Sequence, residues 1–381
     1  MNKTSGKTSG ALDQKEALIF ILIVGFLLRV LITFFTWLPN MQMDSYEYYN
    51  QADTLLSGGY TNYFPNGYPL MIAIAKFFTS GDSEILLLWI NVVFSTLIIW
   101  FIYDIGNRVY ASPRIGLVAA AILAGFPAQL NYVRLLMTEV PTAFFLVGAY
   151  FFYYRKQYFW SGLFFALAIF VRTNVAPIPI LLLAIQTIRN KRVPWRLLTG
   201  CLLPLLAICL YCHAKTGEFS VAGNNQINIL YAVTAKGSYI DFSLNRKHPE
   251  INTSGKALRM YVDHMKADPL GFIGQKWANF WELWAFYPDS VHNTRGVASR
   301  LLLGIGHFFM VVFGIIGWWL HRRSLSSNLL MLPFVTVTLI HTALFAMSRY
   351  TYPVEPFMIL LAASAVVSLT IDRNRARPVR S

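Results

Sequence analysis

The chain has 381 residues, of which 56% are hydrophobic and only 13% are charged. The charged share is about half of the roughly 25% found in an ordinary soluble domain, which excludes a cytosolic enzyme and a disordered chain. Lysine and arginine (32) outnumber aspartate and glutamate (18), so the net charge is +14. The apolar residues form continuous runs rather than alternating segments of about ten residues, which disfavours a transmembrane β-barrel. We therefore predict an all-α polytopic membrane protein.

Ten apolar runs are candidates for transmembrane helices. They are residues 17–37, 85–105, 115–132, 139–154, 160–172, 175–189, 197–213, 301–320, 328–346 and 354–371. The first run follows Lys3, Lys7 and Lys15 and has no small-residue cleavage site after it, so we predict a retained helix. It contains Arg29, which is costly in lipid and needs a polar partner. The fifth and sixth runs are short and could form a tight hairpin, so about ten helices are predicted.

The basic residues alternate along the chain in a way that predicts the topology. They gather in the short segments 1–16, 106–114, 155–159, 190–196, 321–327 and 372–381. The short outer connections hold only Lys76, Arg134, Arg172 and Arg349. By the positive-inside rule the basic segments face the cytoplasm, which gives one transmembrane domain, 17–371, between two cytoplasmic tails. Because topology uses most of the basic charge, no nucleic-acid partner is predicted.

Two segments on the outer side, 38–84 and 214–300, are too long to be simple connections. Both are rich in aromatic residues and contain amphipathic patterns. We expect surface helices at 45–56 and at 255–284, lying against the membrane interface.

Asp44 follows the first helix and is surrounded by the phenols of Tyr46, Tyr48 and Tyr49. A carboxylate in such a partly buried setting can act as a general base. Asp44 could equally cap the surface helix, with Glu47 completing a box-like pattern. Both interpretations stay open at this point.

Six segments lie in an order that resembles a known family. They are Asp44 with Tyr48 and Tyr49, Tyr68-Pro69-Leu70, residues 134–141, Val171-Arg172-Thr173-Asn174, Asp268-Pro269-Leu270-Gly271-Phe272 with Lys276 and Trp281, and Ser348-Arg349-Tyr350-Thr351-Tyr352-Pro353. The chain resembles the polyprenyl-phosphate-sugar glycosyltransferases of the GT-C fold, the group of the protein O-mannosyltransferases and the aminoarabinose transferases of lipid A. It departs from them at Ser45, where a second acidic residue is usual. It is also short for the family and lacks a large C-terminal soluble domain.

The resemblance implies a plasma (inner) membrane enzyme with its active site on the non-cytoplasmic face. It would move a sugar from a polyprenyl-phosphate donor to a hydroxyl of a lipid-linked glycan, a lipid or a protein. Asp44 would be the catalytic base of an inverting single displacement, with Glu47 and Glu139 in reserve. The substrate-binding residues implied are Arg172, Lys276, Arg349, Tyr350, Tyr48 and Tyr68. A divalent metal is possible in this fold, although no metal-ligand cluster is evident in the sequence.

Elementary chemistry gives these charges a use. A phosphate leaves without a strong general acid, unlike the leaving group of a glycosidase that needs two paired carboxylates, so cations and one base suffice. Arginine suits forked phosphate binding and lysine acts as a point charge. Each residue also has a structural alternative: Arg172 and Arg349 could extend to the interface, Lys276 could contact lipid headgroups, and Arg134 could pair with Glu139.

Two other classes of function compete with an enzyme. A lipid or lipid-linked sugar transporter or flippase usually shows internal repeats and charges near the midplane. Here no repeat is evident and the charges gather at outer helix ends, which disfavours transport. A scaffold would leave the two long outer segments without a purpose.

Overall fold

The computed structural model describes residues 9–35, 41, 43–79, 83–284 and 297–375. Every regular element in these ranges is a helix, as predicted. They are α1 (Ser9–Phe34), α2 (Met43–Leu56), α3 (Gly67–Thr79), α4 (Glu84–Tyr110), α5 (Pro113–Gly125), α6 (Pro127–Val133), α7 (Glu139–Tyr154), α8 (Tyr158–Val171), η1 (Thr173–Val175), α9 (Pro177–Asn190), α10 (Trp195–Thr216), α11 (Asn225–Tyr231), α12 (Leu244–Lys247), α13 (Ser254–Ala267), α14 (Pro269–Leu283), α15 (Val297–Leu320), α16 (Leu325–Ala343), η2 (Ser348–Thr351) and α17 (Glu355–Arg375).

In the described residues each of the ten apolar runs is largely helical. Four helices in these ranges are long and apolar enough to span a membrane alone. They are Gln14–Phe34, α4, α10 and α16, and the bent pair α5–α6 could be a fifth. Several of the other apolar helices are shorter. A helix of 14 residues such as α8 is only about 21 Å long, shorter than the roughly 30 Å hydrocarbon core.

Proline breaks two of the predicted helices. The run at 115–132 bends by 54° between α5 and α6, where Pro127 supplies no backbone N–H. The predicted surface helix 255–284 is divided at Asp268-Pro269 into α13 and α14, and the Asp268 side chain accepts a hydrogen bond from the Gly271 N–H. The surface helix predicted at 45–56 is present as α2.

Three further boundaries differ from the sequence-based prediction. The 38–84 segment also contains α3, an apolar helix that was not predicted. Helix α1 begins at Ser9, inside the predicted cytoplasmic tail, and α17 continues to Arg375, inside the other.

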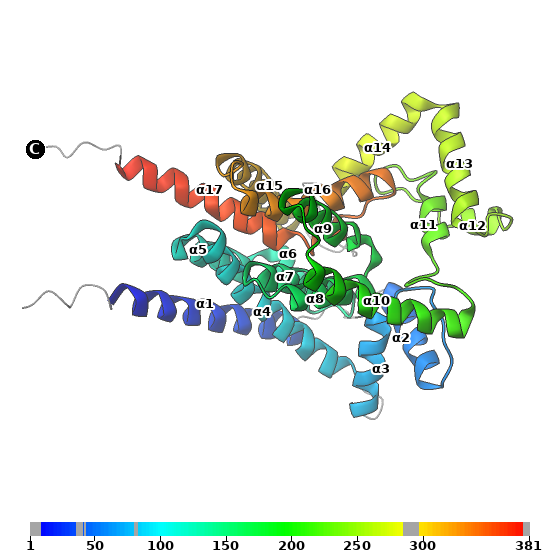
Figure 1. Cartoon of the computed structure of the whole chain (residues 1–381), viewed down its shortest axis with the longest axis horizontal. Helices are drawn as coiled ribbons and strands as arrows, with labels where there is room; N and C mark the ends of the chain where they lie inside the picture. The colour runs from blue at the N-terminus through cyan, green and yellow to red at the C-terminus, as the bar shows by residue number, and fades with distance from the viewer. Residues whose placement is uncertain (1–8, 36–40, 42, 80–82, 285–296, 376–381) are drawn as a thin grey trace, which may run out of the picture.

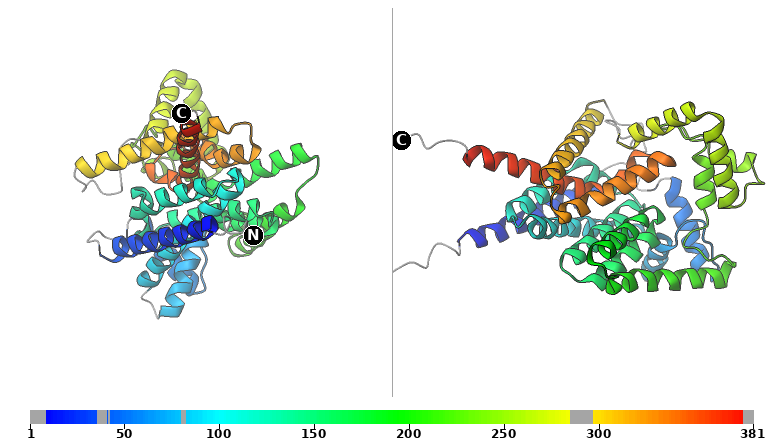
Figure 2. Two further views of the ribbon diagram at one scale, coloured as in Figure 1. Left: turned by 90° about the vertical axis from the view of Figure 1, so that its left-hand side faces the viewer. Right: turned by 45° about the horizontal axis from the view of Figure 1, so that its top comes forward.

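The helices form an elongated bundle with two different ends (Figures 1 and 2). The N-terminal end of α1 and the C-terminal end of α17 lie at one end. The second long outer segment, with α11, α12 and α13, lies at the other end, next to α2. The two outer segments touch there, because Asn62 donates a hydrogen bond from Nδ2 to Glu218 Oε2 at 2.7 Å.

Close helix packing forms the apolar body. Helix α15 packs along α17, and α8 packs against both α7 and α10. Glycine permits the α8–α10 approach, since a Cβ on Gly162 would lie 2.3 Å from the Leu197 carbonyl and one on Gly200 would lie 2.2 Å from that of Phe159. Such small-residue contacts are typical of membrane helix pairs.

Arg29 has the polar partners that its position in α1 requires. Its side chain is fully buried and donates to Ser95 Oγ at 2.7 Å and to the carbonyls of Ala124 at 3.1 Å and Leu123 at 3.3 Å. The Leu123 carbonyl would pair with the N–H of residue 127 in a continuous helix, and Pro127 has none. Arg29 therefore satisfies backbone groups exposed by the break between α5 and α6.

Candidate active site

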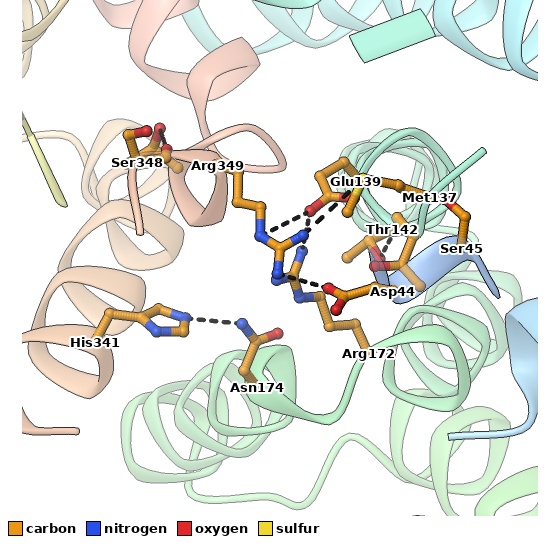
Figure 3. A network of polar contacts seen from close by, with 12 residues as sticks. Asp44, Ser45, Met137, Glu139, Thr142, Arg172, Asn174, His341, Ser348 and Arg349 are labelled. Carbon is orange, nitrogen blue, oxygen red and sulfur yellow. Dashed lines mark hydrogen bonds and ion pairs between the residues drawn. The ribbon is translucent and has the colours of Figure 1, made fainter. Parts of the chain in front are cut away.

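Two carboxylates and two arginines from four separate parts of the chain meet where the outer elements join the bundle (Figure 3). Asp44 lies in the first turn of α2, and Glu139 begins α7. Arg172 follows the last residue of α8, and Arg349 lies in η2. Both acidic residues occupy helix N-termini, where the helix dipole favours negative charge.

The four charges form one connected network. Arg349 Nη2 lies 2.6 Å from Asp44 Oδ2, and Arg172 Nη1 lies 3.2 Å from Glu139 Oε1. Arg349 Nε is 3.9 Å from the same Glu139 oxygen. The Glu139 side chain is 1% exposed and that of Asp44 is 31% exposed. Glu139 therefore contacts both arginines on their buried side, and Asp44 remains accessible to solvent.

The ring of Tyr350 contacts both Arg172 and Arg349. The guanidinium of Arg172 lies 4.6 Å from the centre of its ring and that of Arg349 lies 5.6 Å away. The ring of His341 packs against it at a centroid distance of 4.3 Å. Cation–π contacts keep arginines in place while leaving their N–H donors free for a ligand.

A pocket of about 150 Å³ opens beside this network. Its lining joins predicted residues with residues that the sequence-based prediction missed. The lining consists of Asp44, Tyr48, Phe64, Pro65, Thr138, Val171, Arg172, Thr173, Asn174, Asn224, Asn228, Ile340, His341, Leu344, Phe345, Arg349 and Tyr350. Asn174 stood in a quoted segment without a role, whereas Asn224 and Asn228 carry no local signal in the sequence.

Of the predicted binding tyrosines, Tyr48 lines the pocket and Tyr68 lies behind it. Tyr48 packs edge-on against Tyr68 at a centroid distance of 5.4 Å, and Tyr68 is 1% exposed and outside the lining. Burial raises the pKa of the Tyr48 phenol, so Tyr48 stays protonated beside the ion pairs.

Lys276 also lies outside the lining. Its Nζ donates to the Ala232 carbonyl at 2.9 Å and contacts the faces of the Tyr261 and Phe272 rings. Burial lowers the pKa of Lys276 to about 8. The lysine thus connects α14 to neighbouring segments.

Two short polar residues explain how α2 is oriented. Asp44 is the second residue of α2 and its carboxylate contacts Arg349, whereas Glu47 on the same helix is exposed. Ser45, where the resembling family has an acidic residue, donates to the Leu136 carbonyl at 2.8 Å. This bond fixes α2 against the segment that leads into α7.

The donor set of this network does not suit a resident divalent cation. Within the described residues, no three histidine, cysteine, aspartate or glutamate side chains gather as a metal site would need. Asp44 and Glu139 each contact an arginine instead. The positive charge that a metal would supply is present here on guanidinium groups.

Comparison with known proteins relates part of the chain to a family. Residues 65–213 match the family model of the dolichyl-phosphate-mannose-protein mannosyltransferases. Direct comparison with curated proteins finds no match.

Solved structures extend the likeness to nearly the whole chain. A crystal structure of the Archaeoglobus fulgidus oligosaccharyltransferase with a tethered acceptor peptide aligns with a TM-score of 0.56 and 15% identity, over 97% of this chain and 51% of that one. A structure of the oligosaccharyltransferase AglB from Archaeoglobus fulgidus, with an inhibitory peptide and a dolichol-phosphate, aligns with a TM-score of 0.52 and 16% identity, over 96% and 52%. The chain thus spans about half the length of these structures.

The structural matches confirm the predicted all-helical GT-C fold. The family matched over residues 65–213 is a family of glycosyltransferases. Over residues 65–213 the chain is similar in sequence to the dolichyl-phosphate-mannose-protein mannosyltransferases, and over nearly its whole length it has the fold of the archaeal oligosaccharyltransferase.

Proposed function

We propose that the protein is a plasma-membrane glycosyltransferase that moves a sugar from a polyprenyl-phosphate donor to an acceptor hydroxyl on the non-cytoplasmic face. The observation that carries this proposal is the network of Arg172, Arg349 and Asp44 at one pocket. Two guanidiniums suit a phosphate, and an accessible carboxylate suits a hydroxyl that must lose its proton.

The arginines stabilise the leaving group. In the reaction the bond between the anomeric carbon and the phosphate oxygen breaks, and its electron pair leaves with the polyprenyl phosphate. Arg172 and Arg349 are 15% and 14% exposed at their side chains, so water screens their attraction for the phosphate only weakly. No proton donor to the leaving oxygen is required.

Asp44 takes the proton of the acceptor hydroxyl while the oxygen attacks the anomeric carbon. One displacement forms the new bond as the old one breaks, so the configuration inverts and no sugar–enzyme bond forms. In the structure the Asp44 carboxylate is paired with Arg349. A donor phosphate that takes over Arg349 frees the carboxylate, so the donor binds first.

Glu139 has a different part in this scheme. It is buried and contacts both arginines, so we assign it to positioning the cations rather than to proton transfer. The acceptor, whether a lipid-linked glycan, a lipid or a protein, would approach Asp44 from the end of the bundle that carries α2 and the second long outer segment (Figure 1).

Sugar transfer by the purified chain in detergent tests the proposal, because no gradient exists there and a transporter yields no product. A panel of radiolabelled polyprenyl-phosphate sugars is mixed with membrane lipids and envelope glycans as acceptors. We expect one donor to release polyprenyl phosphate with stoichiometric transfer of its sugar. Arg172→Ala and Arg349→Ala should abolish transfer, while Arg322→Ala, at an exposed position in another part of the chain, should not. Movement of lipid across proteoliposome membranes without sugar transfer would instead support the alternative function, a flippase.

A further inference from the structure

Asn174 lies between His341 and the ion pairs on the pocket wall (Figure 3). Its amide nitrogen faces the His341 ring, with Nδ2 and Nε2 separated by 2.8 Å. In Figure 3 the amide oxygen points away from that ring. The orientation of this amide decides what the pocket offers to a ligand.

A backbone carbonyl fixes the orientation. His341 Nδ1 lies 3.2 Å from the carbonyl oxygen of Phe345, and a carbonyl only accepts, so Nδ1 carries the proton. In the neutral imidazole Nε2 then has a lone pair and accepts. Asn174 must present its NH₂ group to this acceptor, which leaves its Oδ1 on the side of the amide away from the ring.

The amide oxygen is left without a partner. Asn174 Oδ1 is buried and has no hydrogen-bond partner among the residues that the structure describes. A buried acceptor in this condition is costly, and few such atoms occur in native proteins without a reason. Because Asn174 lines a pocket, a ligand hydroxyl that reaches this atom would satisfy it.

The hydrogen-bonding chemistry of Asn174 Oδ1 determines which part of the substrate it can bind. Phosphate oxygens are acceptors, so Asn174 Oδ1 cannot pair with the phosphate that Arg172 and Arg349 bind. A sugar hydroxyl donates and can pair with it. Asp44 lines the same pocket and is assigned to the acceptor hydroxyl, which leaves Asn174 to the sugar of the donor.

We infer that Asn174 Oδ1 accepts a hydrogen bond from one hydroxyl of the donor sugar and that His341 is the positioning residue that holds the amide in this orientation. The inference rests on the proposed function and adds a sugar-recognition site to its phosphate site. A site built around a substrate hydroxyl discriminates strongly against ligands that lack it.

Binding measurements on the full chain in detergent test the inference. The probes are bare polyprenyl phosphate and a panel of polyprenyl-phosphate hexoses and pentoses. We expect wild type to bind at least one sugar-bearing lipid more tightly than the bare lipid. In Asn174→Ala the affinity for that sugar-bearing lipid should fall roughly tenfold, while the affinity for the bare lipid should not change. Asn174→Ser serves as a second variant if the alanine variant does not fold.

A double variant separates positioning from direct contact. If His341 acts through Asn174, His341→Ala alone weakens sugar binding, and the Asn174→Ala/His341→Ala pair binds no worse than Asn174→Ala. A sugar-dependent difference that persists in Asn174→Ala overturns the inference, as does equal binding of all probes by wild type. Failure of the proposed function looks different: Arg349→Ala would then bind bare polyprenyl phosphate as wild type does.

Discussion

Arg349 is the residue on which the network depends, because it contacts Asp44 on one side and approaches Glu139 on the other. Its planar fork offers several N–H donors in fixed directions, whereas lysine offers a point charge. We expect Arg349→Lys to lower transfer about 10–100-fold, the equivalent of one lost charge-assisted hydrogen bond. Turnover by the purified variant, at an expression level like wild type, is the measurement. Equal activities of the Lys and Ala variants would show that Arg349 only extends to the interface.

Lys276 makes a second residue-level prediction, on stability rather than activity. Burial lowers its pKa to about 8 from the ordinary lysine value of 10.5, so between these values the unfolded chain binds more protons than the folded chain. Stability contributed by this group therefore rises with pH through that window and is level below it. We expect the melting temperature of wild type, relative to Lys276→Met, to increase from pH 8 to about 10.5. A constant difference across this range would contradict the assignment.

Helix boundaries show how far the sequence determines the elements. The apolar runs correctly predicted where helices form, because a long continuous apolar stretch is typical of a helix in a membrane. The break at Pro127 was missed, since apolar residues on both sides conceal a proline that removes one hydrogen bond. Helix α3 was missed for the opposite reason. It lies in a segment read as a long outer loop, although its exposed apolar side chains Leu70, Ile74, Phe77 and Phe78 would suit lipid contact.

The break between α5 and α6 gives a prediction at this scale. Arg29→Met would leave the Leu123 carbonyl and Ser95 without the donors that they have now. We expect a loss of about 1–3 kcal/mol of stability, measured as earlier thermal unfolding in detergent. Arg108→Met removes a half-exposed arginine from α4 and is the matched control. Similar unfolding of both variants would mean that Arg29 does not support the break.

The site shows what the sequence alone could not supply. Asp44 and Arg349 are 305 positions apart, and topology placed both at outer helix ends without indicating that they touch. The side chains that complete the pocket, such as Asn224 and Asn228, come from the second outer segment. Only the folded arrangement brings that segment against α2, because their contact depends on the packing of the whole bundle.

The orientation of the whole molecule can be tested by labelling. Ser57→Cys and Ser254→Cys place single thiols at exposed positions of the two long outer segments, in a background without the native cysteines. The charge distribution predicts that both segments face away from the cytoplasm, so an impermeant reagent should label them in intact cells. Ser324→Cys, exposed in the predicted inner segment 321–327, should label only after permeabilisation. The reverse pattern would overturn the topology and the site with it.

The most direct test of the account is turnover by Asp44→Asn. The amide keeps the size of the side chain and can still cap a helix, but it cannot take a proton. A positioned base contributes roughly 10²–10⁴-fold, whereas a lost cap costs only about 1 kcal/mol of stability. We predict that purified Asp44→Asn melts like wild type and still binds polyprenyl phosphate, yet loses at least about 99% of sugar transfer. Retention of more than about a tenth of wild-type turnover, above anything that the loss of a base allows, would contradict the account and move the search for the base to Glu139.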